Sequence, residues 1–427
     1  MFTSTRSNLK VNSSEAIIYG IAKDKGLFTP IKIEKIKPSS KYLKYSYQDF
    51  AKLIFRSFFS DFSSKEINEI VNKAYNKKNF KEYFYKTKII NNIAFLELYH
   101  GNTYAFKDMA LSALPYFMDI AKKKLKLKKK IKIVVATSGD TGGAVLNAFH
   151  NYKDIEVIVL YPNKGVSNTQ ENQMKSLQTP HSHAFAINGN FDDCQRTVKE
   201  LLNHQTSRDI LLTSANSINI ARLIPQVIYY FASYYDLVNK RFIKLNDKIN
   251  YSVPTGNFGD ILAGYIAKKM GLPINKLICA SNENNVLTDF FKTGVYNRNR
   301  KFYKTNSPAM DILVSSNLER LLFLNSSYKE TKKYMDLLEK TGKYQISEQL
   351  KKKLKDFLSV SITSKQTVQG IKELYSSKHY LIDPHTAVGY LGEKKFKLKN
   401  KTVVVSTASP FKFVETVNQA TGKKFKP

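Results

Sequence analysis

Short apolar runs of strand length alternate with helical patterns through the middle of the chain, and this alternation limits the fold more than any other feature. One run at 131–136 is followed by a glycine-rich segment at 137–143, a helical pattern at 144–150 and a second run at 155–160. A strand, turn, helix and strand in this order are typical of a βαβ unit, whose two strands are parallel. The sequence therefore predicts an α/β protein with parallel sheets covered by helices on both faces.

The first 95 residues show a different pattern. Helical spacing of apolar residues recurs at 47–59 and 65–74, a turn is expected at 26–30, and no cluster of titratable residues is present. We therefore expect a small, mostly helical accessory domain at residues 1–95.

The remainder of the chain, 96–427, is expected to form the catalytic region as two interleaved α/β subdomains. A strand-like run at 89–99 leads into it. Residues 283–380 are less regular, with charged helical patterns at 328–341 and 347–360. We expect them to form an insertion on the outer side of the site, where such segments can serve as a lid.

The net charge of +33 points first to nucleic acid or an anionic membrane surface as a partner. Lysines, however, are spread along the chain and far outnumber arginines, which would be favoured for bidentate contacts with phosphates and bases. The densest lysine runs, at 122–124, 128–130 and 351–353, coincide with predicted helix ends or connections, where solvated cations complement the helix dipole. We therefore expect a basic surface that attracts a small anionic substrate, with no nucleic-acid partner.

Cys194 and Cys279 are the only cysteines, and neither lies in a C-x-x-C motif or at metal-ligand spacing from a histidine. We expect both to be buried and no metal to be bound. The longest apolar runs have strand length, and the first residues lack the apolar segment of a secretory signal. These features predict a cytoplasmic protein without a membrane partner, and we expect a monomer or homodimer.

Lys107 is the first candidate for a catalytic residue. It follows the aromatic residues Tyr104 and Phe106, a setting that partly desolvates an amine, lowers its pKa and suits it to Schiff-base chemistry. A solvated lysine at a helix start is the plainer interpretation of this residue taken alone. Ser138 and Thr141 lie in a glycine-rich turn at the carboxyl end of a predicted strand, where their hydroxyls could hold a carboxylate. A tight turn without any ligand is equally compatible with that segment.

Two further segments carry anion-binding features. The segment 254–260 joins a predicted strand to a predicted helix, and its glycines Gly256 and Gly259 allow several N–H groups to converge on a phosphate. We expect Asp260 to cap the first turn of that helix. Arg222 lies off the apolar face of a predicted helix, beside a cluster of Asn and Ser residues, where it can meet an anion.

His385 follows the turn that opens another predicted helix. Because no partner carboxylate is identifiable nearby, a structural role is favoured over a catalytic one. The predicted strand at 403–405 ends in the hydroxyl-rich segment 406–410, which resembles the other strand ends in its polar character.

Five segments, in their order along the chain, resemble the threonine synthase family. They read HGNTYAFKD at 100–108, SGDTG at 138–142, SANSIN at 214–219, GNFGD at 256–260 and STASP at 406–410. Any one of them is weakly specific, whereas five in this order are highly specific, and the resemblance covers essentially the whole chain. It implies a pyridoxal phosphate enzyme of the tryptophan synthase β-like fold, also called fold type II. It also implies the reaction, a carbon–oxygen lyase step that converts O-phospho-L-homoserine and water to L-threonine and phosphate by γ-elimination and β-addition of water, the last step of threonine biosynthesis.

The resemblance also implies a role for each site residue. Those at the cofactor would be the covalent ligand Lys107, the phosphate cradle Gly256, Asn257, Phe258, Gly259 and Asp260, the pyridine partner Thr407, and Asp140 near the ring hydroxyl. Those at the substrate would be Ser138 and Thr141 for its carboxylate, and Asn216, Ser217 and Arg222 for its phosphate. Two positions depart from the usual pattern. Asp140 stands where many enzymes of this fold have Asn, and Asn102 stands where the family usually has Pro, which is expected to loosen the loop before Lys107.

Two other functions are compatible with the sequence. A related dehydratase or phospholyase of the same fold would share the cofactor site, although the accessory domain and Asp140 speak against the plain dehydratases. A basic nucleic-acid-binding protein on a decayed enzyme scaffold would require strongly salt-dependent DNA binding. The intact Lys107 and the intact 256–260 loop speak against such decay.

Overall fold

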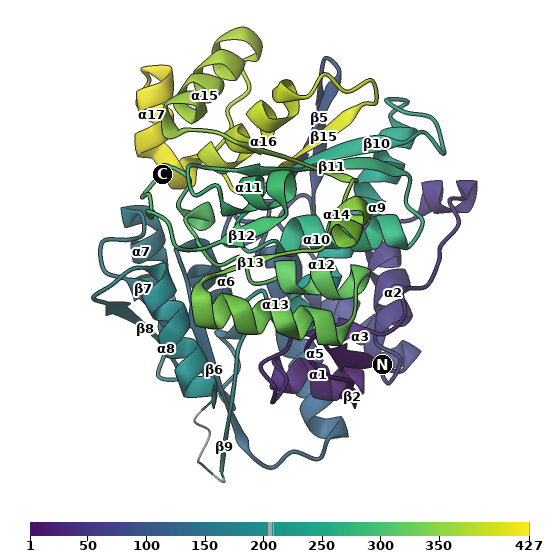
Figure 1. Cartoon of the computed structure of the whole chain (residues 1–427), viewed down its shortest axis with the longest axis vertical. Coiled ribbons are helices and arrows are strands. Elements are labelled where there is room, and N and C mark those ends of the chain that lie inside the picture. Colours follow the sequence, from purple (N-terminus) through teal and green to yellow (C-terminus); the bar gives the residue numbers. More distant parts are fainter. Residues whose placement is uncertain (204–206, 208, 427) are drawn as a thin grey trace.

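The computed structural model describes residues 1–203, 207 and 209–426, whose arrangement is shown in Figure 1. Residues 204–206, 208 and 427 fall within the expected catalytic region and lie outside the described part. Two larger sheets, one of six strands and one of four, organise this part of the chain. Apart from one edge strand, all pairs in them are parallel, so the predicted α/β architecture is confirmed.

The six-stranded sheet draws its strands from widely separated parts of the chain. In sheet order they are β14 (Phe357–Ser361), β11 (Ile274–Ser281), β10 (Ile249–Pro254), β15 (Thr402–Ser406), β5 (Ile93–Glu97) and β4 (Lys86–Ile90). The central strands β10 and β15 are buried at every residue. Continuous burial of this kind is typical of parallel strands covered on both faces.

The four-stranded sheet is formed by residues between 130 and 213. In sheet order its strands are β8 (Ser182–Ile187), β7 (Ile155–Pro162), β6 (Lys130–Ala136) and β9 (Ile210–Thr213). Helix α6 (Asp140–Phe149) connects β6 to the parallel strand β7, which is the βαβ unit predicted from the sequence. The helix begins at Asp140 rather than at 144, so Gly142 and Gly143 lie inside it instead of in the predicted turn. Gly142 closely approaches Met174 and Thr137, where a side chain would not fit.

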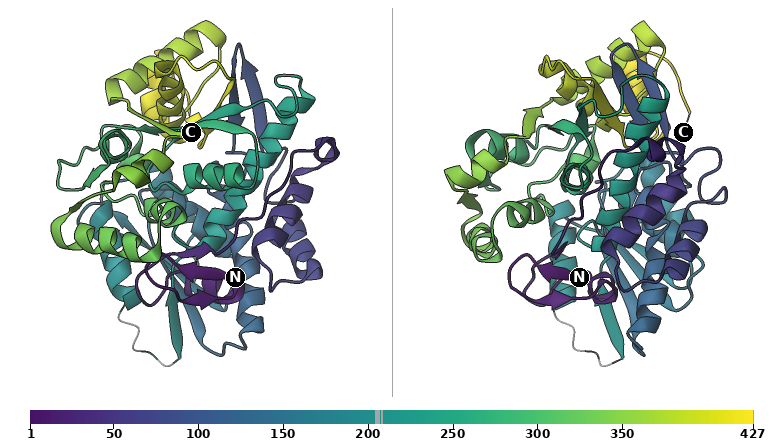
Figure 2. Two further views of the ribbon diagram at one scale, coloured as in Figure 1. Left: turned by 45° about the vertical axis from the view of Figure 1, so that its right-hand side comes forward. Right: turned by 90° about the vertical axis from the view of Figure 1, so that its right-hand side faces the viewer.

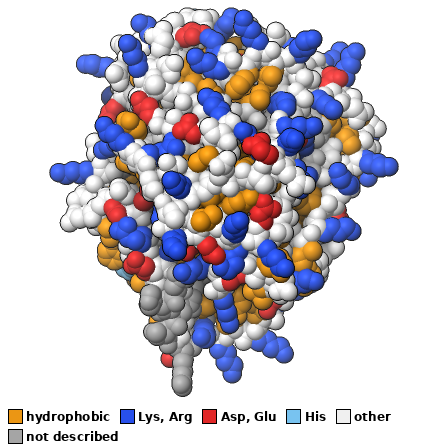
Figure 3. All heavy atoms as spheres, in the orientation of Figure 1, with side chains coloured by type: hydrophobic (Ala, Val, Ile, Leu, Met, Phe, Trp, Pro, Cys, Tyr) orange, Lys and Arg blue, Asp and Glu red, His pale blue; other side chains and the backbone are white. Residues whose placement is uncertain are grey.

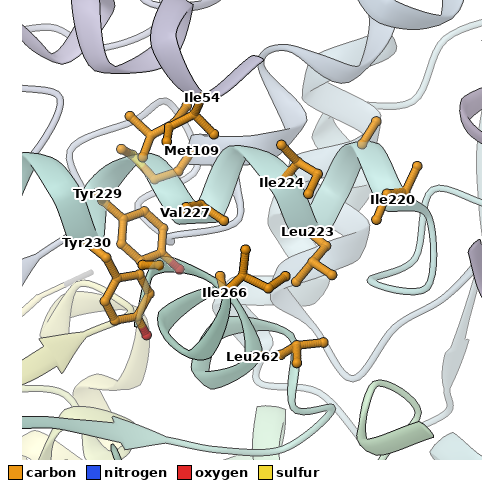
Figure 4. Close-up of a cluster of buried hydrophobic side chains, with 14 of the residues drawn as sticks. Ile54, Met109, Ile220, Leu223, Ile224, Val227, Tyr229, Tyr230, Leu262 and Ile266 are labelled. Atoms are coloured by element: carbon orange, nitrogen blue, oxygen red, sulfur yellow. The ribbon is translucent and has the colours of Figure 1, made fainter. Parts of the chain in front are cut away.

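Helix α9 (Ile220–Asn239) lies at the centre of the molecule. It packs against helices α2 (Tyr47–Phe58), α4 (Asp108–Leu111) and α10 (Gly259–Lys269). Figure 4 shows Ile54, Met109 and Ile266 from these three helices around its apolar side chains. Nearly every residue of α9 is buried, so the buried surface of the helix is wider than the apolar stripe predicted from the sequence. The packing of this helix fixes the position of Arg222 near its start.

The N-terminal region combines a small antiparallel sheet with three helices, as Figure 2 shows near the N-terminus. The sheet has the order β2 (Lys10–Val11), β1 (Phe2–Ser4) and β3 (Phe28–Pro30), and the helices are α1 (Ser13–Tyr19), α2 and α3 (Ser64–Ala74). The predicted helices at 47–59 and 65–74 are confirmed as α2 and α3. The turn predicted at 26–30 is wrong in part, because residues 28–30 pair with β1 more than twenty residues earlier.

Two predicted elements are divided in the structure. The strand predicted at 89–99 is a hairpin of β4 and β5, whose turn contains Asn91 with φ 55°. The helix predicted at 347–360 is only α14 (Glu348–Lys353), after which the chain pairs with β11 as β14. Strand β14 thus belongs to the six-stranded sheet, although it lies in the segment expected to be an insertion.

The other elements complete the helical layers around the two sheets. The helix predicted after Lys107 is divided, with Pro115 in the first turn of its second part. The remaining helices are α5 (Leu114–Lys124), α7 (Asn168–Ser176), α8 (Phe191–Asn203), α11 (Val286–Thr293), α12 (Leu318–Asn325), α13 (Tyr328–Thr341), α15 (Ser364–Lys378), α16 (Pro384–Lys395) and α17 (Val414–Thr421). A two-stranded sheet joins β12 (Val295–Asn297) to β13 (Lys343–Gln345), and short 3-10 helices are η1 (Ser40–Lys44), η2 (Pro308–Met310) and η3 (Pro410–Phe413).

Lysine and arginine side chains are scattered over the face seen in Figure 3 rather than gathered into one band, and acidic side chains lie among them. Cys194 and Cys279 are both buried and free, as expected. Across residues 1–203, 207 and 209–426, none of the helices combines the length and the apolar character that a membrane span requires.

Candidate active site

A cavity of about 790 Å³, including its open mouth, lies where the carboxyl ends of strands from both sheets meet. Segments that follow β5, β6, β9, β10 and β15 each contribute to its wall, as expected for ligand sites of parallel sheets. Every site residue named from the sequence lines this cavity: Lys107, Ser138, Asp140, Thr141, Asn216, Ser217, Arg222, Gly256, Asn257, Phe258, Gly259, Asp260 and Thr407. The fold thus brings together residues that are up to 300 positions apart.

Lys107 lies just before the short helix α4, and its amine faces the cavity 4.4 Å from the centre of the Phe106 ring. Burial, together with the nearby Arg222 guanidinium, lowers the pKa of this amine to about 8, although the carboxylates of Asp140 and Asp260 act in the opposite direction. A substantial fraction of the amine is therefore neutral near physiological pH, as a nucleophilic lysine requires.

The loop that carries Lys107 is fixed by backbone and side-chain contacts. The Phe106 N–H donates to the Thr407 carbonyl at 2.8 Å, which joins the loop to the end of β15. Asp108 accepts from the Thr103 N–H at 2.8 Å and from the Thr103 hydroxyl at 2.7 Å. Burial raises the pKa of Asp108 to about 6. These bonds fix Thr103, which directly follows Asn102, the residue expected to loosen the loop.

The segment after β10 forms the start of helix α10. Phe258 adopts a left-handed conformation with φ 64°, and α10 begins at Gly259, so that first-turn N–H groups without partners inside the helix lie at the cavity. The expectation that Asp260 caps this helix is wrong. Its carboxylate instead accepts from the hydroxyls of Tyr229 and Tyr230 on α9, at 2.7 and 2.8 Å, and burial raises its pKa to about 6.

Gly256 lies where a side chain would collide with the backbone. A Cβ atom there would be 2.8 Å from the Ala309 carbonyl oxygen, whereas a Cβ at Gly259 would have no heavy atom closer than 3.6 Å. We therefore expect Gly256→Ala to lower the free energy of unfolding by about 1–3 kcal/mol. Gly259→Ala is the matched control and should be neutral or stabilising, because alanine is favoured over glycine in helices. Urea unfolding measures both, and equal stability of the two variants would contradict the close contact at Gly256.

Arg222 is buried, with 2% of its surface exposed, and donates from Nη1 to the Ala215 carbonyl. Among the described residues, no carboxylate oxygen lies close enough to this guanidinium to form a salt bridge, and Nε has no hydrogen-bond partner. Burial lowers the pKa of this guanidinium to about 10. A buried cation with a free donor at the edge of a cavity is suited to binding an anionic ligand.

The neighbouring polar residues are partly used by the protein itself. The Asn216 side chain donates to the Ala136 carbonyl at 2.7 Å and accepts from its N–H at 3.2 Å, which ties the end of β9 to the end of β6. The Ser217 hydroxyl accepts from Asn317 Nδ2 at 3.2 Å. At the other wall, Gly139 precedes α6 with φ 134° and leaves Ser138 and Thr141 at the cavity.

Several buried polar atoms at or beside the cavity have no hydrogen-bond partner in the described part of the chain. They are Asn257 Oδ1, Asp260 Oδ2 and Arg222 Nε. A buried polar atom without a partner costs free energy unless a ligand or water supplies one. The free Nε donor of Arg222, the amine of Lys107 and the start of α10 fit a polar ligand that carries an aldehyde and a phosphate.

His385 is a cavity residue whose environment was misjudged from the sequence. Its Nδ1 lies 2.8 Å from Asp383 Oδ1, so the statement that no carboxylate partner is nearby is wrong. Its Nε2 accepts from the Ala309 N–H at 3.2 Å, which holds that segment beside Gly256. The i, i+2 spacing of Asp383 and His385 was the signal available in the sequence. It is easily overlooked, because an aspartate at a helix start is usually assigned only to capping.

Comparison with known proteins gives results that agree with this geometry. Residues 87–409 match the family of pyridoxal-phosphate dependent enzymes, and residues 1–75 match the family described as threonine synthase N terminus. The chain is 37% identical to threonine synthase of Saccharomyces cerevisiae, over 98% of this chain and 89% of that protein. The crystal structure of pyridoxal phosphate-bound threonine synthase from Brucella melitensis aligns with a TM-score of 0.90 at 35% identity, over 99% of this chain and 92% of that one. The yeast enzyme aligns with a TM-score of 0.88 at 35% identity, over 98% and 89% of the two chains.

Proposed function

Because the chain belongs to the threonine synthase family of pyridoxal-phosphate dependent enzymes, we propose that its cavity converts O-phospho-L-homoserine and water to L-threonine and phosphate. One observation carries this proposal. A single cavity holds an amine of lowered pKa, Lys107, together with two separate anion-binding features, the start of α10 and the buried Arg222. The cofactor and the substrate each carry a phosphate, so a threonine synthase needs two such places.

The cofactor would be held by residues from three strand ends. Lys107 Nζ would be the covalent ligand, the segment Gly256 to Asp260 would surround the phosphate, and the Thr407 hydroxyl would meet the pyridine nitrogen. Pyridoxal phosphate, when bound, supplies an electron sink for negative charge that forms beside the substrate amino group. A hydroxyl at the pyridine nitrogen, instead of a carboxylate, would leave the ring less electron-withdrawing, which suits eliminations better than transamination.

The substrate would lie between the start of α6 and the start of α9. Ser138 and Thr141 can donate to its carboxylate, while Arg222, with Ser217 and Asn216, faces its phosphate. The guanidinium neutralises the charge that develops as phosphate leaves the γ carbon, and in a buried site this interaction is stronger than in water. Arg222 would therefore contribute both to substrate binding and to the elimination step.

Lys107 would also move protons. When its amine is not bonded to the cofactor, Nζ can take the proton from the α carbon of the substrate and then help to transfer the β proton. A base with a pKa of about 8 is near the operating pH, where proton transfer in both directions is efficient. Phe106, Phe191 and Met310 line the same cavity and limit the access of water to this amine.

The reaction can be tested directly on the purified protein. Incubation with pyridoxal phosphate should produce a visible absorbance band, and O-phospho-L-homoserine should then yield equal amounts of inorganic phosphate and threonine. Phosphate with an oxo acid in place of threonine would identify a phospholyase or dehydratase relative. The absence of both products would remove the proposed reaction.

The division after residue 95, the roles of the individual site residues, the cytoplasmic location, the monomeric or homodimeric state and the lack of a nucleic-acid partner stay predictions. The small anionic substrate follows from the family, and salt-dependent binding of DNA would be the observation that revives a nucleic-acid partner.

A further inference from the structure

Lys412, in the 3-10 helix η3 after β15, is a buried lysine that the sequence did not single out. Its exposed fraction is 4%, and its Nζ lies 2.6 Å from Asp140 Oδ1. The same ammonium donates to the Thr103 carbonyl at 2.8 Å and lies 3.3 Å from Gln173 Oε1. Among the described residues, no other lysine–carboxylate salt bridge has both side chains less than a tenth exposed.

Asp140, the partner of Lys412, lies in the cavity wall at the start of α6. Its Oδ1 also accepts from Gln170 Nε2 at 3.0 Å. Burial alone would raise the pKa of this carboxyl, but the charge and hydrogen bond of Lys412, with smaller contributions from His385 and Gln170, together lower it. Asp140 is therefore an ionised carboxylate that faces the cavity and is held from behind by an ammonium.

Lys412 thus connects three parts of the site. It reaches from the end of β15, which carries Thr407, to α6 through Asp140 and to the loop of Lys107 through Thr103. We propose that Lys412 is a positioning residue of the active site, which fixes the Asp140 carboxylate and the Thr103 carbonyl beside Lys107 so that the ion pair acts there as one nearly neutral unit. This proposal rests on the proposed function only in taking Lys107 as the amine that binds the cofactor.

The charges around Lys107 explain why the pairing matters. Arg222 on α9 and Lys412 on η3 lower the pKa of the amine, whereas Asp140 on α6 and Asp260 on α10 raise it, in addition to the effect of burial. Because Asp140 and Lys412 act in opposite directions, the pair together changes the pKa of Lys107 little. Loss of either partner leaves one buried charge uncompensated, and removal of both restores a neutral wall.

The test is a double-mutant cycle with Lys412→Met, Asp140→Asn and the double variant. The rate at which the apo-protein takes up pyridoxal phosphate is followed by visible absorbance from pH 6 to 10, since only the neutral amine attacks the aldehyde. The midpoint of this pH profile, near 8 in the unchanged protein, should rise by about one unit in Lys412→Met and fall by about one unit in Asp140→Asn, a tenfold change in proton affinity. The double variant should return towards the original midpoint.

Urea unfolding of the apo-proteins provides a second readout that does not depend on the cofactor. Each single variant should unfold at a lower urea concentration than the double variant. The matched control is the exposed pair Lys123 and Asp119 on α5, 2.8 Å apart, whose Met and Asn variants should change neither readout. Lys412→Arg keeps the charge and should keep the pH midpoint.

A double variant that is less stable in urea than each single variant, or an unchanged pH midpoint in Lys412→Met, would overturn the proposal. If Lys412→Met does not fold, the double variant decides, because it removes both charges and must fold and keep the midpoint; its failure also overturns the proposal. An unchanged protein that takes up no pyridoxal phosphate would instead refute the proposed function, while the unfolding cycle would still measure the ion pair.

Discussion

Replacement of Lys107 by alanine is expected to reduce threonine formation by at least about 10³-fold and to remove the visible absorbance of the bound cofactor. Among the described residues that line the cavity, Lys107 is the only one with an amine that can bind an aldehyde covalently. The same amine is expected to move the substrate protons. Both functions disappear with the side chain. Product assays and an absorbance spectrum after removal of free pyridoxal phosphate measure the two losses separately.

Two controls distinguish this effect from a general loss of lysine. Lys123→Ala removes a side chain that is 72% exposed on α5 and should leave both the absorbance and the activity unchanged. Lys107→Arg keeps the positive charge but cannot form the covalent bond, and should be as inactive as the alanine variant. An active Lys107→Ala protein that still shows the absorbance band would remove Lys107 from the proposed role.

Replacement of Arg222 by methionine is expected to have opposite effects on catalysis and on stability. The ratio kcat/KM should fall by about 10²–10³-fold, mainly through a higher KM, because a buried hydrogen-bonded charge contributes about 2–5 kcal/mol to binding an anion. The free energy of unfolding of the apo-protein should stay the same or increase, since the buried guanidinium has no carboxylate partner among the described residues and a methionine can occupy the place of the arginine stem without a charge. Steady-state kinetics and urea unfolding test the two parts.

Arg320 offers a matched comparison, because it is also a fully buried arginine. Its guanidinium donates to the carbonyls of Phe28 and Ile218 and to Asn317, so it holds the N-terminal sheet against the catalytic region. Arg320→Met should therefore lower the free energy of unfolding, in contrast to Arg222→Met. Arg222→Lys keeps the charge and loses the fork of donors, so an intermediate KM is expected. A KM for O-phospho-L-homoserine that does not change in Arg222→Met would exclude this residue from the substrate site.

Local patterns in the sequence were sufficient for much of the fold. The βαβ unit around 137–143, the helices α2, α3 and α13, and the buried face of α9 follow from apolar spacing and turn residues, which act over a few positions. The segments around Lys107, Ser138, Arg222, Gly256 and Thr407 were also recognisable in the chain, and the structure brings all of them to one cavity. Strands β3 and β14 were missed because each depends on pairing with a distant strand, β1 or β11.

The amino-acid sequence by itself determined most of the order of elements, the residue types at the strand ends and the family. The partners of the charged residues were decided only by the tertiary structure. Asp260 meets two tyrosines of α9, His385 meets Asp383 and Ala309, and Asp140 meets Lys412 from the far end of the chain. The physical reason is that burial and Coulomb interactions depend on distances in space, which residues far apart in the chain acquire only when the two sheets pack together.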